Sequence, residues 1–218
     1  THRQYRHGTR DAIVKHPQIE SDELMMIKDW MAWVTNDDPR LQAEFKSGLK
    51  VYTFPSKKIR VPVDKEAVLR NGIVAEKDAD LIVDYIDIEL NDDVLYKSSI
   101  IMLDIIANNN WERPIYFSGG SDKDEEYIWM KDYLQLEGLA YKLVPIHTPR
   151  GRTLLDMGRI DSEKMYNIVM GWDWGNAGSG DIYHDTETRK NSISYRSNLA
   201  LLAEQLLIEG KTKKAEDI

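Results

Sequence analysis

Two stretches of the sequence combine residue types that could bind a ligand. In the first, residues 113–126, an apolar run ends at Ser118, Gly119 and Gly120 and leads into a segment typical of the first turn of a helix. A strand, a glycine turn and a helix together can cradle a phosphate, because the free N–H groups at a helix start carry a partial positive charge. The layout therefore raises the question of a phosphate site.

The residues around this glycine turn do not favour phosphate. No Lys with a neighbouring Ser or Thr follows the last glycine, and the three spaced glycines of a dinucleotide-binding turn are missing. The next turn carries four carboxylates that would satisfy the helix start and repel a phosphate, namely Asp122, Asp124, Glu125 and Glu126. We interpret Ser118, Gly119 and Gly120 as a tight turn that ends a core strand and borders an acceptor or glycan groove, without chemistry of its own.

The second stretch, residues 171–185, is rich in Gly and Trp. Trp172, Asp173, Trp174 and Asn176 offer aromatic faces beside hydrogen-bonding groups, a combination that suits carbohydrate recognition. Loops carry binding residues more often than cores do. The alternative is packing, because Trp is mostly buried and a loop Trp often fills the seam between a domain and its neighbour. The sequence alone leaves both interpretations open.

Other classes of site have no signature. The absence of Cys excludes thiol catalysis, disulfide bonds and thiolate metal ligands. The five His residues never have the i, i+4 spacing of a helical zinc site, and no nucleophile motif such as G-x-S-x-G occurs. The net charge of -8 argues against a nucleic-acid partner, since Lys and Arg are not clustered for phosphate contacts. We therefore expect no catalytic residue, no metal ligand and no cofactor.

The elements that must position these residues follow from apolar periodicity. In the first third of the chain the patterns predict a helix at about 21–35, strands at 51–54 and 59–63, and a helix at 64–71. Pro55 and Pro62 are expected to make the two strands sheet edges or extended arms. Asp64 is the expected N-cap of the second helix, which ends at Gly72.

The middle of the chain is its most regular part. Strand patterns at 81–90, 114–118 and 140–146 alternate with helix patterns at 94–107 and 124–137. The order β-α-β-α-β favours an α/β fold with a largely parallel sheet on which helices pack. Ser118 would then lie at the carboxyl end of a strand, where ligands bind in such sheets.

The C-terminal segment has the pattern of a helical repeat. After a helix at 162–170, a long amphipathic helix is predicted from Glu187 to Gly210, and a new helical pattern starts directly afterwards. This matches the first half of a helix-turn-helix repeat of the tetratricopeptide type. We divide the chain into an α/β domain over 1–185, in which residues 1–50 either join the sheet or form a helical arm, and the beginning of a repeat over 186–218.

Several stretches together resemble one protein family. NNNWERPIYFS (108–118), YLQLEGLAYKLVPI (133–146) and the segment from Trp174 onward are similar to the C-terminal soluble region of large bacterial multi-pass membrane proteins. The hydrophobic N-terminal region of that family resembles membrane-embedded, lipid-sugar-dependent protein O-mannosyltransferases. The resemblance covers residues 100–218 well and 1–99 loosely. The chain is accordingly expected to be a soluble piece of a larger protein, since no run approaches the roughly 20 apolar residues that span a bilayer.

The resemblance implies a location and a role. The location is the extracytoplasmic, periplasmic side of the bacterial inner membrane, with the membrane-embedded part of the parent chain and further helical repeats as partners. The catalytic carboxylate of such transferases lies near their first membrane helices, so no residue here inherits a catalytic role. We expect a non-catalytic accessory domain that binds or positions a protein or glycan acceptor. Two alternatives are a phosphosugar- or nucleotide-sugar-binding enzyme domain, in which Arg150 or Arg152 would serve the Gly119–Gly120 turn, and a pure protein-interaction module.

Overall fold

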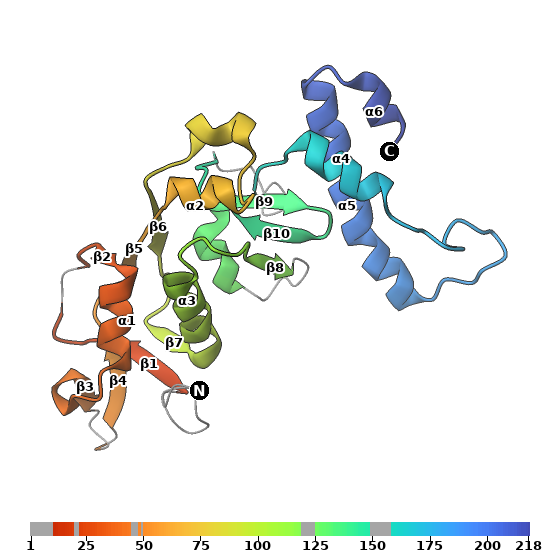
Figure 1. Cartoon of the computed structure of the whole chain (residues 1–218). Helices are drawn as coiled ribbons and strands as arrows, with labels where there is room; N and C mark the ends of the chain where they lie inside the picture. The colour runs from red at the N-terminus through yellow and green to blue at the C-terminus, as the bar shows by residue number, and fades with distance from the viewer. Residues whose placement is uncertain (1–10, 20–21, 45–47, 49, 119–124, 149–157) are drawn as a thin grey trace. The chain divides into compact units, whose positions relative to one another are not determined.

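The computed structural model describes residues 11–19, 22–44, 48, 50–118, 125–148 and 158–218. The chain divides into two compact units, whose elements are labelled in Figure 1. Unit 1 comprises Thr1–Pro114 and Glu125–Met130, and unit 2 comprises Ile115–Asp124 and Lys131–Ile218. Both units combine helices with small sheets, so the expected α/β class is confirmed.

Unit 1 holds two small mixed sheets. The larger has the order β3-β4-β1-β7, in which β1 is parallel to β4 and antiparallel to β7. The smaller has the order β2-β5-β6, with β2 parallel and β6 antiparallel to β5. The strands are β1 (Ala12–Lys15), β2 (Met25–Met26), β3 (Gln42–Glu44), β4 (Lys50–Phe54), β5 (Lys58–Pro62), β6 (Tyr85–Glu89) and β7 (Val94–Tyr96). Within residues 1–50, β1 and β3 therefore lie in the larger sheet of unit 1.

Helices connect these strands, and the helix expected at 94–107 begins later, at Lys97, because residues 94–96 form β7. The α-helices of unit 1 are α1 (Ile27–Thr35), α2 (Lys65–Arg70) and α3 (Lys97–Asn109), and its short 3-10 helices are η2 (Pro39–Leu41) and η3 (Glu76–Leu81). The predicted cap of α2 is confirmed, since the Asp64 carboxylate accepts the backbone N–H of Ala67 at 2.9 Å. Gly72 follows the helix with a φ of 63°, as a C-terminal glycine should.

The prediction that two prolines place their strands at sheet edges is wrong. β4 lies between β3 and β1, and β5 lies between β2 and β6. The reason is the position of each proline relative to its strand. Pro55 comes after the last residue of β4, and Pro62 is the last residue of β5, so neither removes an N–H from the middle of a ladder.

Tryptophan side chains anchor the core of unit 1. Trp30 of α1 and Phe54 of β4 are fully buried, with their ring centroids 5.9 Å apart. The indole N–H of Trp30 donates to the carbonyl of Ser56 at 2.8 Å, and that of Trp111 donates to the carbonyl of Pro62 at 2.8 Å. Each anchor therefore buries a large apolar surface and satisfies its polar atom within its own chain.

Unit 2 combines an antiparallel sheet with three α-helices. The sheet has the order β8-β10-β9. Its strands are β8 (Tyr116–Ser118), β9 (Leu134–Glu137) and β10 (Ala140–Leu143), and its helices are α4 (Ser162–Met170), α5 (Thr186–Ile208) and α6 (Thr212–Glu216). The 3-10 helix η4 (Glu125–Tyr133) precedes β9.

The predicted parallel β-α-β-α-β core is wrong. The strand expected at 81–90 is β6 in a sheet of unit 1, whereas those expected at 114–118 and 140–146 are β8 and β10, which pair antiparallel. The helix expected at 124–137 is replaced by η4 and β9. Three strands that the sequence pattern placed in one sheet therefore belong to two sheets.

A tight turn after β9 explains this topology. Glu137 and Ala140 are partners across the β9–β10 pair, so only Gly138 and Leu139 connect the strands. Gly138 has a φ of 67° and Leu139 does not share a positive φ, which is the pattern of a type II′ turn. A two-residue turn can join only antiparallel strands.

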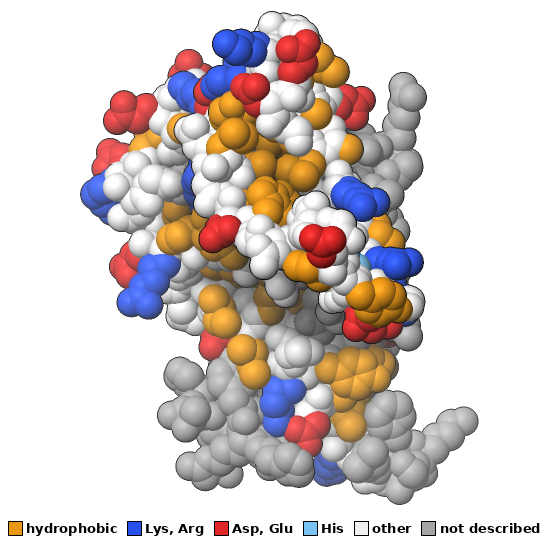
Figure 2. All heavy atoms as spheres, turned by 90° about the vertical axis from the view of Figure 1, so that its right-hand side faces the viewer, with side chains coloured by type: hydrophobic (Ala, Val, Ile, Leu, Met, Phe, Trp, Pro, Cys, Tyr) orange, Lys and Arg blue, Asp and Glu red, His pale blue; other side chains and the backbone are white. Residues whose placement is uncertain are grey.

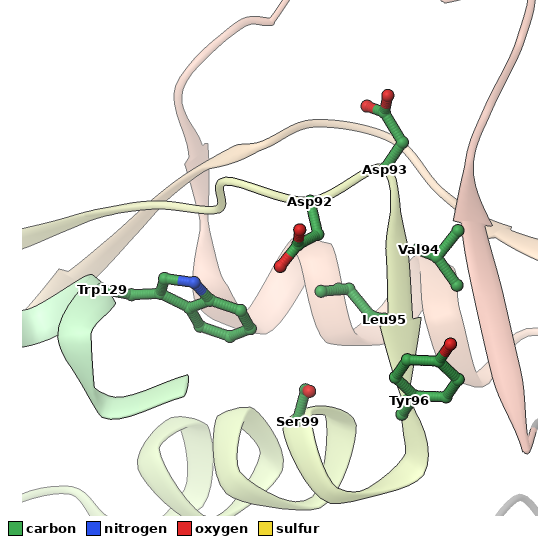
Figure 3. Close-up of a pocket in the computed structure, with 7 residues that line it drawn as sticks. All are labelled: Asp92, Asp93, Val94, Leu95, Tyr96, Ser99 and Trp129. Carbon is green, nitrogen blue, oxygen red and sulfur yellow. The ribbon is translucent and has the colours of Figure 1, made fainter. Parts of the chain in front are cut away.

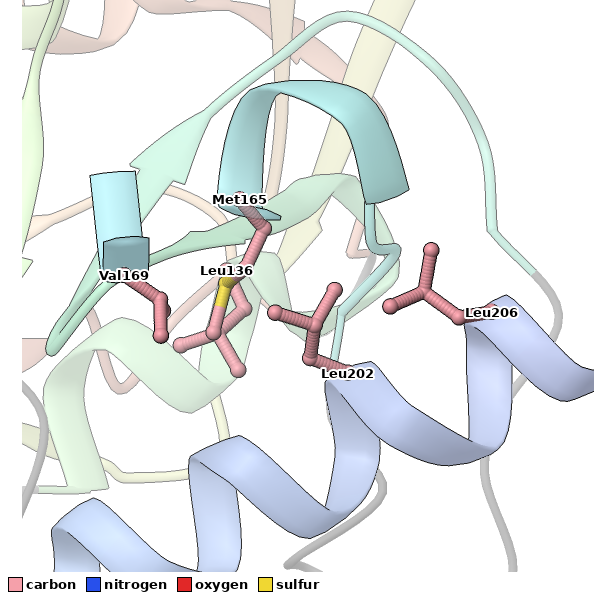
Figure 4. Packing of buried hydrophobic residues seen from close by; sticks show 5 residues of the cluster. All are labelled: Leu136, Met165, Val169, Leu202 and Leu206. Atoms are coloured by element: carbon pink, nitrogen blue, oxygen red, sulfur yellow. The ribbon is translucent and has the colours of Figure 1, made fainter. Parts of the chain in front are cut away.

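Apolar side chains from the sheet and two helices form the core of unit 2. The buried cluster shown in Figure 4 consists of Leu136 from β9, Met165 and Val169 from α4, and Leu202 and Leu206 from α5. Ala215 and Ile218 also pack against it, beyond a turn at Gly210 whose φ is 73°. The repeat assignment of this helix pair and the boundary at residue 185 stay predictions.

Within the described ranges, no helix has both the length and the apolar character to cross a membrane.

Candidate functional site

The Gly- and Trp-rich segment 171–185 links α4 to α5 and is shaped by its own hydrogen bonds. The backbone N–H of Trp172 donates to the carbonyl of Val169 at 3.0 Å. The Asp173 carboxylate accepts the N–H of Gly175 at 2.8 Å, which closes an Asx turn. The carbonyl of Trp174 accepts a further backbone bond at 3.0 Å from Ala177. These bonds fix the backbone that carries both Trp side chains.

Trp172, Trp174 and Tyr195 form a cluster of three mutually contacting rings, here called the aromatic cluster. The ring centroids are 5.4 Å apart for Trp172 and Trp174, 5.6 Å for Trp172 and Tyr195, and 5.8 Å for Trp174 and Tyr195. The planes meet at 76°, 77° and 61°, in the edge-to-face arrangement that aromatic quadrupoles favour. The structure thus brings the two predicted Trp residues together and adds a tyrosine from α5.

The cluster has a buried side and an open side. Trp172 is partly buried and packs against the core cluster of unit 2, whereas Trp174 is 47% exposed. Neither indole N–H has a hydrogen-bond partner among the residues that the structure describes. Trp174 therefore presents an aromatic surface and the cluster retains polar donors, on a support that the protein core holds in place.

The predicted polar residues of the loop differ in their roles. Asp173 shapes the loop through its bond to Gly175 and is exposed, so a carboxylate oxygen remains available to a ligand. Asn176 is exposed, and its backbone carbonyl accepts the N–H of Ser179 at 2.9 Å. Asp173 therefore shapes the loop, and the binding role expected of Trp172, Asp173, Trp174 and Asn176 stays a prediction.

Sequence reasoning missed Tyr195, although a signal was present. Leu199, Leu202 and Leu206 form the apolar stripe of α5, and Tyr195 lies one helical turn before Leu199. The stripe thus continues to the tyrosine. A further bond ties the same helix to the sheet, since the Asn198 side-chain amide donates to the carbonyl of Gly138 at 2.9 Å.

The first predicted stretch is described only in part. Ser118 is the last residue of β8, is exposed and pairs with Ala140 of β10. Gly119 and Gly120 lie outside the described residues, as do Arg150 and Arg152, so the role of this turn stays a prediction. Among the residues that can be assessed, no group of three or more His, Asp or Glu side chains could hold a metal ion.

An ion cluster around the buried Glu137 carboxylate on the unit 2 sheet was also missed. The Glu137 carboxylate, 4% exposed, accepts hydrogen bonds from the Tyr116 hydroxyl at 2.8 Å and the Gln135 amide at 2.7 Å. The Lys164 ammonium lies 2.8 Å from it, and that of Lys142, 2% exposed, lies 3.5 Å away. Tyr116, Lys142 and Gln135 form one row across the three strands. The cluster therefore links all three strands to α4.

Burial and charge together set the protonation of this ion cluster. Burial, assisted by Glu137, raises the pKa of Tyr116 to about 12, and burial lowers the pKa of Lys142 to about 8 despite the nearby carboxylate. Burial also acts to raise the pKa of Glu137, but bonds from Lys164 and Tyr116 and the charge of Lys142 outweigh it and lower that pKa. Because the buried charges of Glu137 and Lys142 lie 3.5 Å apart and Glu137 has further partners, we assign the cluster a structural role.

Comparison with known families returns one match. The model of the family described as TMEM260-associated domain 2 matches residues 1–164, about three quarters of the chain. The matched part contains unit 1, the three strands of unit 2 and the start of α4, and it ends before the aromatic cluster. Neither a curated protein nor a solved structure gives a significant match.

Proposed function

The chain belongs to the TMEM260-associated domain 2 family, and we propose that it is a non-catalytic accessory domain of a membrane glycosyltransferase-like protein. In this role it binds or positions an acceptor or its glycan. The family description, which points to association with a membrane protein, supports the proposal, as does the resemblance to the soluble region of protein O-mannosyltransferase-like membrane proteins. The proposal includes an extracytoplasmic, periplasmic location and two partners, the membrane-embedded part of the parent chain and further helical repeats.

The aromatic cluster is the observation that carries this proposal. A sugar ring has an apolar C–H face and a rim of hydroxyl groups, so it suits an exposed indole face flanked by donors and acceptors. Trp174 supplies such a face, the indole N–H groups supply donors, and Asp173 supplies an acceptor. A single stacked sugar with few hydrogen bonds should bind with a Kd on the order of 1 mM, which suits a domain that positions a substrate.

A titration with two variants tests the proposal. Intrinsic fluorescence is followed while the chain is titrated with mannosylated peptides and with the same peptides lacking the sugar. We expect a saturable change with the glycopeptides that is lost in Trp174→Ala. The matched control is Tyr183→Ala, which removes an 83% exposed aromatic side chain from the same loop and should leave binding unchanged. Equal responses in the two variants, or equal responses to both kinds of peptide, would contradict the proposal.

A protein-interaction module is the second candidate, and exposed apolar side chains favour it. Figure 2 shows hydrophobic side chains in patches between charged ones on the face it draws. In unit 2 the exposed hydrophobic residues include Tyr183, Ile193, Leu207 and Ile208. This candidate predicts binding to unglycosylated peptides, which the titration above distinguishes. The phosphosugar alternative gains little from Lys142 of the unit 2 sheet, because its ammonium already pairs with Glu137 at 3.5 Å.

A further inference from the structure

Unit 1 contains a cavity of about 300 Å³ beside β7, an edge strand of the larger sheet (Figure 3). It is lined by Asp92, Asp93, Val94, Leu95, Tyr96, Ser99 and Trp129. Ligand pockets span roughly 300–1,000 Å³, so this one suits a single small group rather than a large cofactor. The aromatic cluster and the proposed glycan contact make no use of it.

The two carboxylates of this cavity have different roles. Asp93 forms an ion pair with Lys57 at 2.6 Å, and its side chain points away from the centre of the cavity. Asp92 points into the space between Trp129, Leu95 and Ser99 (Figure 3). Its carboxylate has no hydrogen bond or ion pair with another described residue. One uncompensated negative charge therefore faces an indole ring and an apolar wall.

This combination selects a cation on an apolar stem. An indole ring is the best aromatic partner for a cation, and a nearby carboxylate adds charge attraction. The buried Leu95 side chain suits an alkyl chain, and the overall charge of -8 repels anions. We propose that the cavity binds the ammonium or guanidinium group of a Lys or Arg side chain.

The position of β7 indicates that this side chain is presented by a partner polypeptide. In the described sheet β7 pairs on one side only, with β1, which leaves its other edge for an additional strand. An extended peptide can pair with such an edge while alternate side chains enter neighbouring pockets. Val94 and Tyr96 are exposed on β7 and would line its path. The Asp92 carboxylate in the cavity then favours peptides that place a cationic side chain there.

Amide spectra of isotope-labelled full-length chain test the inference. The probe is a capped Gly-Lys-Gly peptide, and the readout is the indole N–H signal of Trp129, assigned by its loss in Trp129→Phe. We expect a saturable shift of this signal that disappears when the lysine is acetylated. Asp92→Asn should weaken binding by about three- to tenfold, because it removes the charge and keeps the shape. Asp80→Asn, an equal charge change at another exposed site of unit 1, should leave binding unchanged.

Two outcomes would overturn the inference. An unmoved Trp129 signal at saturating peptide would exclude the cavity as the site, and an equal shift with the acetylated peptide would exclude a charge-selective one. Butylammonium supplies the same cation without a peptide backbone and should bind more weakly than Gly-Lys-Gly. Equal affinities for butylammonium and Gly-Lys-Gly would contradict the proposal that a polypeptide presents the cation. None of these results depends on the response of Trp174 to glycans, so this inference and the proposed function fail separately.

Discussion

Two pairs of tryptophans, one pair in each unit, are used in different ways. In unit 1, Trp30 and Trp111 are buried and each donates its indole N–H to a backbone carbonyl at 2.8 Å. In unit 2, Trp172 and Trp174 contact each other and Tyr195, and neither N–H has an acceptor among the described residues. A Trp that stabilises a fold normally has its polar atom paired inside it. Under the proposed function, the difference separates Trp30 and Trp111, which build the core of unit 1, from Trp172 and Trp174, which are proposed to contact a glycan.

Unit 2 obtains its stability from other groups. Its three strands are linked through the ion cluster around Glu137, and its helices pack on the sheet through Leu136, Met165 and their apolar neighbours. The exposed ring of Trp174 is not a member of that buried apolar cluster. Under the proposed function, stability and recognition depend on different residues, so substitutions should separate them.

Removal of the Trp30 side chain should have the largest effect. Trp30→Ala deletes a fully buried ring and its hydrogen bond to Ser56, and such truncations cost about 3–5 kcal/mol. Denaturant unfolding followed by circular dichroism measures the loss for unit 1. A loss below about 1 kcal/mol would show that the core of this unit does not depend on its tryptophan anchor.

Breaking the ion cluster should come next. Glu137→Gln leaves Lys142 buried without its main counter-charge, which should cost about 3 kcal/mol at neutral pH. The matched control is Glu163→Gln, which removes an exposed carboxylate 2.7 Å from Lys211 and should change stability little. Equal effects of the two substitutions on the unfolding free energy would contradict a structural role for the cluster.

Comparison of the unchanged chain with Glu137→Gln also predicts a pH dependence of stability. The folded-state pKa of Glu137 lies below its ordinary value of 4.5, so the stability from its ionised form is fully present above that value. It is lost as the pH falls through the folded-state pKa. The difference in unfolding free energy between the unchanged chain and Glu137→Gln should therefore shrink with acidification below about pH 4. A difference in unfolding free energy that grew with acidification would contradict this prediction.

Substitution at the hairpin turn should have a smaller effect that reaches the site. Gly138→Ala forces a side chain onto a φ of 67° and places its Cβ 3.1 Å from Ile168 and 3.4 Å from the Trp172 ring. We expect a loss of about 1–2 kcal/mol and weaker glycopeptide binding as Trp172 shifts. Gly178→Ala, at a glycine with open space and no positive φ, is the control and should be nearly neutral. Comparable losses of stability in Gly138→Ala and Gly178→Ala would argue against a tight turn at Gly138.

Removal of Trp174 should change stability least. Trp174→Ala deletes a ring that is 47% exposed, so the loss should stay below about 1 kcal/mol while glycopeptide binding disappears. Unfolding curves and the fluorescence titration, measured on one preparation, give both quantities. A loss as large as that of Trp30→Ala would make Trp174 a core residue and remove the contrast between the units.

Local features of the fold were predictable and its topology was not. The cap at Asp64, the glycine after α2 and the long helix α5 depend on neighbouring residues, so their signals lie within a few positions. The pairing of β10 with both β8 and β9 depends on the turn at Gly138 and on contacts between distant segments. Alternating strand and helix patterns cannot distinguish this arrangement from a parallel sheet.

In the candidate site, too, features set by neighbouring residues were predictable and contacts between distant segments were not. The composition of residues 171–185 singled out Trp172 and Trp174, because this Gly-rich segment places aromatic side chains beside hydrogen-bonding ones. Tyr195 reaches the rings from α5, and the ion cluster depends on the register that aligns Tyr116 with Lys142. Such contacts depend on cross-strand and helix-to-loop geometry, and only the three-dimensional structure shows them.

The most direct test of the central claim records the indole N–H signals of all six Trp while mannosylated peptide is added. If the aromatic cluster is the recognition surface, the signals of Trp172 and Trp174 shift and saturate together, while those of Trp30 and Trp111 stay in place. Unmoved signals of the cluster at saturating glycopeptide, or equal shifts of the core tryptophans, would contradict the claim that unit 2 reserves its tryptophans for a ligand.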